Sequence, residues 1–133
     1  MELQVGVKAF IKDEQGNYLT LKRSAPYEGE AEPRWDIPGG RINAGEPIFE
    51  ALKREIKEET NLIMQGEPHI LYAQDILRVE GRHVVRLTFE AKAEGEIKLD
   101  PKEHSAYQWV KLSDIKNLHH DLYLTRVLQI MGG

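Results

Sequence analysis

Apolar and polar residues follow two different periods along this chain, and the change of period marks its elements. Between Pro47 and Asn61 the apolar residues recur at spacings of three and four, which predicts a helix. Pro47 suits the first turn because its missing N–H would have no partner there, and Asn61 suits the end because asparagine tolerates the left-handed conformation. Segments rich in β-branched and aromatic residues predict strands at 5–11, 18–21, 70–79, 83–93 and 107–110.

The connections between these segments complete the expected order of elements. Residues 13–17 and 80–82 have the composition of hairpin turns, and residues 23–34 form a polar loop with the length of a substrate-side loop. A helical region opens near residue 112, and its main helix is expected at 118–131. With no repeat or linker, the chain is expected to form one α+β domain over residues 1–133, with a mixed sheet between helices.

Three glutamates give the central helix an unusual face. Glu55, Glu58 and Glu59 fall at i, i+3 and i+4, so their like charges lie together and repel one another. A bound divalent cation would reverse the sign of that interaction. The alternative is a solvated acidic face, which Arg54 and its neighbouring lysines would partly offset. The preceding Pro-Gly-Gly turn at 38–40 lets backbone groups approach a ligand, and hard oxygen ligands of this kind suit magnesium or manganese.

Composition narrows the classes of function. The chain has 133 residues, a formal net charge of −4 and no cysteine. The acidic balance argues against stable binding to nucleic acid, and the missing cysteines exclude disulfides and thiolate metal sites. No apolar run approaches the length of a membrane span, and the N-terminus lacks the pattern of a signal peptide. A cytoplasmic protein without a membrane partner is therefore expected.

The stretch from Gly40 to Leu62 resembles the Nudix box, Gly-x5-Glu-x7-Arg-Glu-U-x-Glu-Glu-x-Gly-U, in which U is a bulky aliphatic residue. The matching positions are Gly40, Glu46, Arg54, Glu55, Ile56, Glu58, Glu59 and Leu62. Only the second glycine of the box is replaced, by Asn61, at a position that closes the helix. The resemblance implies the Nudix fold, an α/β/α sandwich with a central mixed β-sheet. It also implies a hydrolase that breaks phosphoanhydride bonds.

The same resemblance implies roles for individual residues. Mg²⁺, or alternatively Mn²⁺, is expected on Gly39, through its carbonyl, and on Glu55, Glu58 and Glu59. Arg54 is expected to orient a neighbouring glutamate. The base that deprotonates water would be Glu55, Glu58 or a loop acid, for which Glu103 is the candidate. Glu103 resembles the loop glutamate that approaches the metals in some family members, although an exposed loop acid is an equal alternative. His104 is expected at the surface.

Substrate contacts are expected from basic and aromatic residues near the box. The candidates are Arg23, Tyr27, Trp35, Arg41, Arg78 and Arg86. A nucleoside triphosphate or a related nucleotide, including an oxidised one, is the first expected substrate. A dinucleoside polyphosphate is the alternative, because the pattern His-x-Ala-Tyr-x-Trp at 104–109 resembles that of diadenosine polyphosphate hydrolases. A non-catalytic nucleotide-sensing module would have no reason to keep repelling carboxylates. A homodimer is a further expectation, since dimers are common among relatives.

Overall fold

The computed structural model describes residues 1–133 in one α+β arrangement. The elements are β1 (Glu2–Ile11), β2 (Tyr18–Arg23), β3 (Trp35–Asp36), β4 (Gly39–Arg41), α1 (Ile48–Thr60), β5 (Ile63–Ile76), β6 (Arg82–Glu94), β7 (His104–Val110), α2 (Leu112–Ile115) and α3 (Leu122–Met131). None of these helices combines the length and the hydropathy that a membrane span requires.

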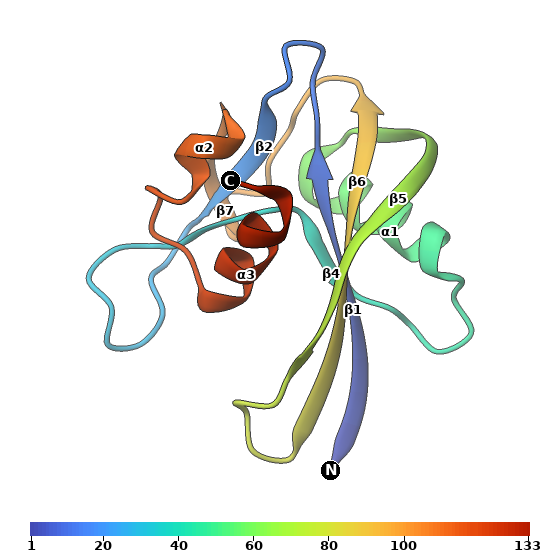
Figure 1. The fold of residues 1–133 in the computed structure, drawn as a ribbon, viewed down its shortest axis with the longest axis vertical. Coiled ribbons are helices and arrows are strands. Elements are labelled where there is room, and N and C mark those ends of the chain that lie inside the picture. Colours follow the sequence, from blue (N-terminus) through green and yellow to red (C-terminus); the bar gives the residue numbers. More distant parts are fainter.

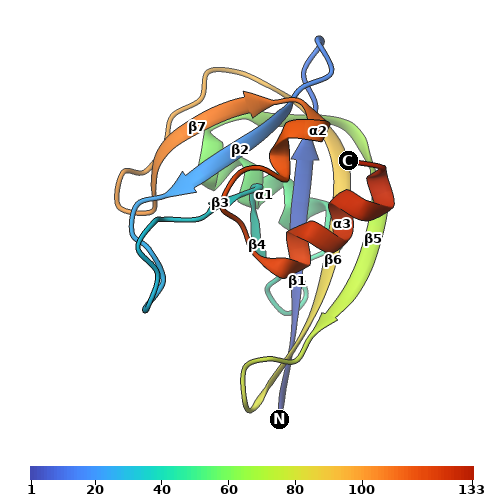
Figure 2. The same cartoon turned by 60° about the vertical axis from the view of Figure 1, so that its left-hand side comes forward.

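The strands form two sheets that share the centre of the molecule. A four-stranded sheet has the order β4-β1-β6-β5, with β1 and β6 parallel and the other pairs antiparallel. A three-stranded antiparallel sheet has the order β3-β2-β7. Figures 1 and 2 show β2 and β7 lying across the end of the larger sheet, toward which β1 points.

Helices cover the mixed sheet on its two faces (Figures 1 and 2). On the α1 side, Ala51, Leu52 and Ile56 are fully buried against alternate residues of β1, such as Val7 and Ala9. A second cluster joins α2 and α3 to the opposite face of β1. Its buried members are Phe10, Tyr18, Ile37, Val110, Ile115, Leu124, Val127 and Leu128. Alternate residues of β1 thus pack into two hydrophobic cores, one on each face of the sheet. The expected α/β/α sandwich with a central mixed sheet is confirmed.

Helix α1 has the boundaries that its sequence predicts. Pro47 stands at the N-cap in an extended conformation, and the helix runs to Thr60. Asn61 adopts the left-handed conformation with φ 69°, and its N–H donates to the carbonyl of Lys57. Asparagine therefore supplies the left-handed conformation that glycine usually provides, and its side chain also accepts from Lys57 at 2.9 Å and donates to the Glu96 carbonyl at 3.0 Å.

Several strand ends differ from the sequence prediction by two or three residues, and three differences are larger or change the type of element. Gly39 and Gly40 were expected in a turn, but they belong to β4 and pair with β1. Strand β5 begins at Ile63 rather than at 70, because register shifts between 65 and 72 hide its alternation. Helix α3 begins at Leu122 rather than at 118, because the Asp121 side chain accepts a hydrogen bond from the Leu124 N–H and caps the helix there.

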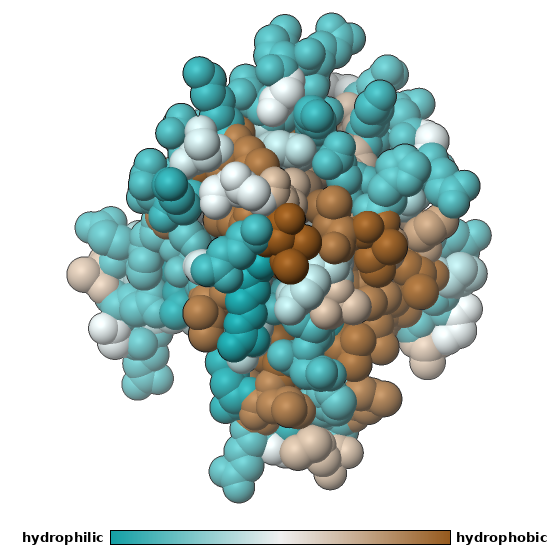
Figure 3. All heavy atoms as spheres, viewed as in Figure 1, coloured by the Kyte–Doolittle hydropathy of each residue, from teal (hydrophilic) through white to brown (hydrophobic).

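The uncovered long edge of the larger sheet is β5. Figure 3 shows hydrophobic surface on the side of the molecule where β5 lies in Figure 1. Ile63 and Ile70 on this strand are 40% and 59% exposed. The homodimer stays a prediction.

Candidate active site

A cavity of about 620 Å³ is lined by residues of both sheets, of α1 and of the connecting loops. Its basic lining residues are Lys8, Arg23, Arg41, Arg78, Arg82, Arg86 and Lys102. Its acidic lining residues are Asp36, Glu59, Glu103 and Asp121. Seven of the chain's 18 lysines and arginines therefore line the cavity, against four of its 22 acids. A chain that is acidic overall concentrates positive charge here, which suits a polyanionic ligand.

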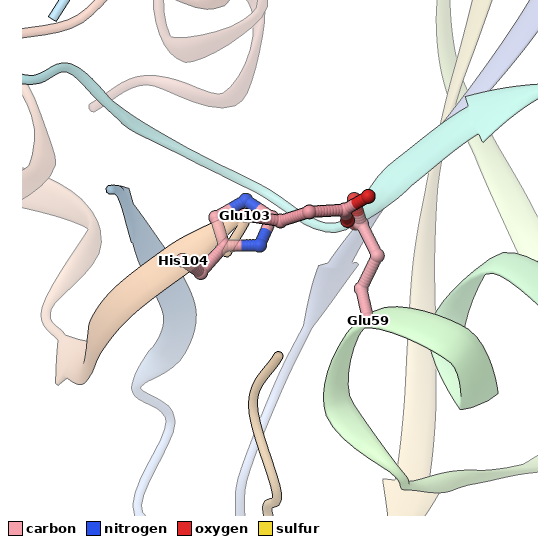
Figure 4. A group of neighbouring side chains, drawn as sticks. All are labelled: Glu59, Glu103 and His104. Atoms are coloured by element: carbon pink, nitrogen blue, oxygen red, sulfur yellow. The ribbon is translucent and has the colours of Figure 1, made fainter. Parts of the chain in front are cut away.

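Two carboxylates meet within this cavity, and we call them, together with His104, the carboxylate centre. Oxygen atoms of Glu59 and Glu103 and a ring nitrogen of His104 lie within 4.8 Å of one another. Figure 4 shows Glu59 extending from α1 and Glu103 from the chain just before β7, with their carboxylates together. Burial lowers the pKa of His104, which keeps its ring neutral at pH 7. His104 was expected at the surface; its side chain is half-buried and lines the cavity.

Glu59 is held in place from the neighbouring strand. Its carboxylate accepts a hydrogen bond of 2.8 Å from the Gly39 N–H. Burial raises the pKa of Glu59 to about 7. The charges of Glu55 and Asp36 add to the rise, whereas Lys8 and the Gly39 N–H oppose it. A carboxyl group in this position has an unfavourable negative charge that a cation would stabilise.

The two glycines of β4 allow the strand to lie between β1 and α1. Gly39 has φ 153°, and a Cβ there would lie 2.0 Å from the Val7 carbonyl oxygen. A Cβ at Gly40 would lie 2.4 Å from a carboxylate oxygen of Glu55. Any side chain at either position would displace the strand or the glutamate, so glycine at both positions is what lets β4 approach β1 and the Glu55 carboxylate this closely.

Arg54 gathers the other acids of the box. Its Nη1 donates to Glu55 at 2.7 Å and to Glu58 at 3.2 Å. Its Nε and Nη2 donate to the two carboxylate oxygens of Glu46 at 2.7 and 2.9 Å, and Nη2 also reaches the Arg41 carbonyl. Hydrogen bonding to Arg54 lowers the pKa of Glu46 to about 2. Arg54 thus orients two of the three glutamates that were expected to bind metal, and of these three only Glu59 belongs to the carboxylate centre.

The structure brings most of the predicted site residues together. Around the cavity lie Arg23, Tyr27, Gly39, Arg41, Glu59, Arg78, Arg86 and Glu103. Glu55 and Glu58 do not line the cavity and instead accept hydrogen bonds from Arg54. Trp35, in β3, does not line the cavity either. The guanidinium groups of Arg23 and Arg34 make cation–π contacts with the Tyr27 ring, and their central carbons lie 4.1 and 4.6 Å from its centroid. The ring is therefore stacked on arginines before any ligand arrives.

Several lining residues escaped the sequence prediction. Lys8 donates to Asp36 at 2.8 Å and to the Ile37 carbonyl, which ties β1 to β3 beneath the cavity. A single lysine between the fully buried Val7 and Ala9 was the available sign, since a charge in an apolar strand needs a partner. Arg82, Lys102 and Asp121 carried no such sign. They stand in connections or at element ends, and only the tertiary structure brings them to the cavity.

Comparison with known proteins identifies the family. The family model of the NUDIX domain matches residues 2–127, nearly the whole chain. The chain belongs to the Nudix family. It is a hydrolase acting on phosphoanhydride bonds, as the box predicts.

Individual relatives agree with the family assignment. The nucleoside triphosphatase NudI of Escherichia coli is 34% identical over 129 residues, which cover 88% of this chain and 89% of NudI. The crystal structure of a MutT Nudix hydrolase from Burkholderia pseudomallei superposes with a TM-score of 0.81 at 27% identity, covering 97% of this chain and 98% of that one. A MutT protein from Methanosarcina mazei gives 0.79 at 28% identity, covering 96% and 91%.

Proposed function

We propose that this Nudix hydrolase is a Mg²⁺-dependent pyrophosphohydrolase of nucleoside triphosphates. The observation that carries the proposal is the position of the carboxylate centre inside a cavity rich in arginine and lysine. A nucleoside triphosphate needs both features, because its phosphates require positive charge and its hydrolysis requires acids that hold a cation and move a proton. The similarity to NudI, a nucleoside triphosphatase, favours the same substrate class.

The donor set of the site fits magnesium. Glu59 and Glu103 bring carboxylate oxygens together, and oxygen is the ligand that Mg²⁺ prefers. Glu55, Glu58 and the Gly39 carbonyl lie on the adjoining α1 and β4 and complete the set that the Nudix box predicts. His104 adds a neutral ring nitrogen, which Mn²⁺ accepts more readily than Mg²⁺ does. When bound, the ion neutralises phosphoryl oxygens and makes water more acidic.

The remaining chemistry falls to residues of the chain. Glu103 is our candidate for the base that takes the proton from water, because its carboxylate is exposed to the cavity while Glu55 and Glu58 are engaged by Arg54. Arg23 is placed to bind a phosphate, since its Nε is buried without a partner and its guanidinium is stacked on Tyr27. A charged donor in that state gains most from an anionic acceptor.

Product analysis on a nucleotide panel tests the proposal. Wild-type protein should convert nucleoside triphosphates to monophosphates and pyrophosphate with Mg²⁺ and should be inactive in EDTA. Glu103→Gln should lower kcat by about 10² to 10⁴ if it removes the base. Glu50→Gln is the matched control, because this glutamate is exposed on the first turn of α1 and makes no side-chain contact with the site. If the protein hydrolyses no nucleotide, the proposed function is wrong. If Glu103→Gln keeps full activity, Glu103 is not the base.

A dinucleoside polyphosphate is the second candidate. Basic residues reach the cavity from both sheets, with Arg23 on β2 and Arg86 on β6, so both halves of such a molecule would meet positive charge. Diadenosine tetraphosphate in the same panel separates the two candidates. A kcat/KM for it above that for every nucleoside triphosphate would reverse our order of preference.

A further inference from the structure

Three arginines converge on one face of the larger sheet, around a glycine. Gly6 on β1 is paired with Arg41 on β4 and with Arg86 on β6. Residues directly opposite on neighbouring strands share a face, and Arg82, four residues before Arg86, lies on that face too. A Cβ at Gly6 would lie 3.3 Å from Nη1 of Arg41, so this guanidinium lies over the glycine. We call Arg41, Arg82 and Arg86 the arginine cluster.

The charges of the arginine cluster are poorly balanced within the protein. Arg41 donates to the neutral side chain of Gln4 at 2.9 Å. Arg86 has a carboxylate of Asp121 at 3.8 Å, beyond hydrogen-bond distance. Arg82 makes no ion pair and no side-chain hydrogen bond. Glu2, which stands opposite Arg82 in the strand register, accepts from Gln4 instead.

Like charges in the cluster therefore disfavour one another. Arg41 and Arg86 stand opposite the same glycine from the two strands that flank β1, and Arg82 lies on the same face, so three positive charges share this side of the sheet. No carboxylate accepts a side-chain hydrogen bond from any of the three guanidinium groups; their one ion pair is Arg86 with Asp121 at 3.8 Å, and Asp36 is a further acid near Arg86. A bound anion would relieve this repulsion, as it does at other arginine sites for phosphate.

The cluster is separate from the carboxylate centre but within reach of the same ligand. Arg41 and Gly39 lie two residues apart on β4, a spacing of about 7 Å along a strand. The Gly39 N–H holds Glu59, and all three arginines line the same cavity as Glu59 and Glu103. A ligand held at the carboxylate centre therefore extends toward the cluster if it carries a further group.

We propose that the arginine cluster binds a phosphate group of the substrate beyond the two that the scissile bond joins. The inference rests on the proposed function, since it takes the carboxylate centre to hold the reacting pyrophosphate. Two sources share this chemistry: the third phosphate of a triphosphate chain, and a phosphate on the sugar. In either case Arg82 is a specificity-determining residue, because no interaction within the protein occupies it.

Nucleotide binding in EDTA, measured by isothermal titration calorimetry, tests the cluster without hydrolysis. ADP is the reference ligand, and ATP and adenosine 3′-phosphate 5′-diphosphate each add one phosphate in a different place. For wild-type protein, one of the two should bind at least about tenfold more tightly than ADP, as expected for a charge-assisted contact. The tighter ligand identifies the source of the phosphate.

Substitutions then assign that gain to the cluster. Arg82→Gln and Arg86→Gln should each reduce the gain over ADP to about twofold while changing the affinity for ADP less. Arg126→Gln is the matched control, because Arg126 stacks on Tyr123 at 5.3 Å, as Arg86 does at 5.8 Å, but does not line the cavity. Arg82→Gln removes no side-chain hydrogen bond and no ion pair, so its fold is expected to be intact.

The outcomes separate this inference from the proposed function. An undiminished gain in Arg82→Gln and Arg86→Gln, or no gain in wild-type protein, overturns the inference even if nucleotides are hydrolysed. A gain that depends on the cluster supports it even if no nucleotide is hydrolysed with Mg²⁺. An equal loss in Arg126→Gln would show that general charge, not the cluster, attracts the third phosphate, and would also overturn it.

Discussion

Replacing Glu59 by glutamine should stabilise the metal-free protein, and should do so only at neutral and alkaline pH. Burial raises the pKa of this carboxyl group from its ordinary value of 4.5 to about 7. The folded state therefore binds the proton more tightly than the unfolded state does. The resulting stabilisation is complete below pH 4.5 and is lost as the pH rises through 7.

The size of the effect follows from that pKa difference. A change from 4.5 to about 7 corresponds to about 3 kcal/mol between the two protonation states. Glutamine resembles the protonated carboxyl and does not titrate. Glu59→Gln should therefore match the wild type near pH 4.5 and exceed its free energy of unfolding by up to about 3 kcal/mol at pH 8.5.

Urea unfolding in EDTA at the two pH values measures this difference directly. Glu50→Gln removes the same charge from an exposed position on the same helix and should show no comparable gain. Adding Mg²⁺ at pH 8.5 should stabilise the wild type more than Glu59→Gln, because the ion offsets the negative charge of the Glu59 carboxylate, which glutamine lacks. A variant no more stable than the wild type at pH 8.5, or stabilised equally at both pH values, would refute the reasoning.

Two further substitutions test the scaffold of the site. Gly39→Ala should destabilise the fold by about 3 kcal/mol or more, because φ is 153° and the new Cβ would lie 2.0 Å from the Val7 carbonyl oxygen. Gly29→Ala is the comparison, since Gly29 also has a positive φ but no atom lies within 4 Å of its added Cβ. Near-native urea unfolding of Gly39→Ala would contradict the prediction. Glu46→Gln should lower Tm at pH 7, since hydrogen bonding to Arg54 holds the pKa of Glu46 at about 2. That contribution is present above pH 4.5 and lost as the pH falls through 2, so the difference in Tm should shrink with acidification and should not persist at pH 2.

Local features of the sequence determined the helix, the box and the chemistry expected of them. The boundaries of α1 follow from Pro47, a period of three and four, and Asn61, all of which act within a few residues. The glutamate spacing placed three carboxylates on one helix, and the Pro-Gly-Gly segment marked a close approach of the backbone. Phosphoanhydride hydrolysis followed from the box, because its pattern is long and nearly complete.

Tertiary structure alone decided which of these groups work together. Glu55 and Glu58 share a helix face with Glu59, yet Arg54 holds them while Glu59 meets Glu103, which is distant in sequence. The start of β5 was hidden by register shifts, and the role of β4 as a strand depends on its pairing with β1. The arginine cluster depends on the parallel pairing of β1 with β6, which sets Arg86 opposite Gly6. Such contacts join residues far apart in the chain, and no local propensity encodes which partner a strand will take.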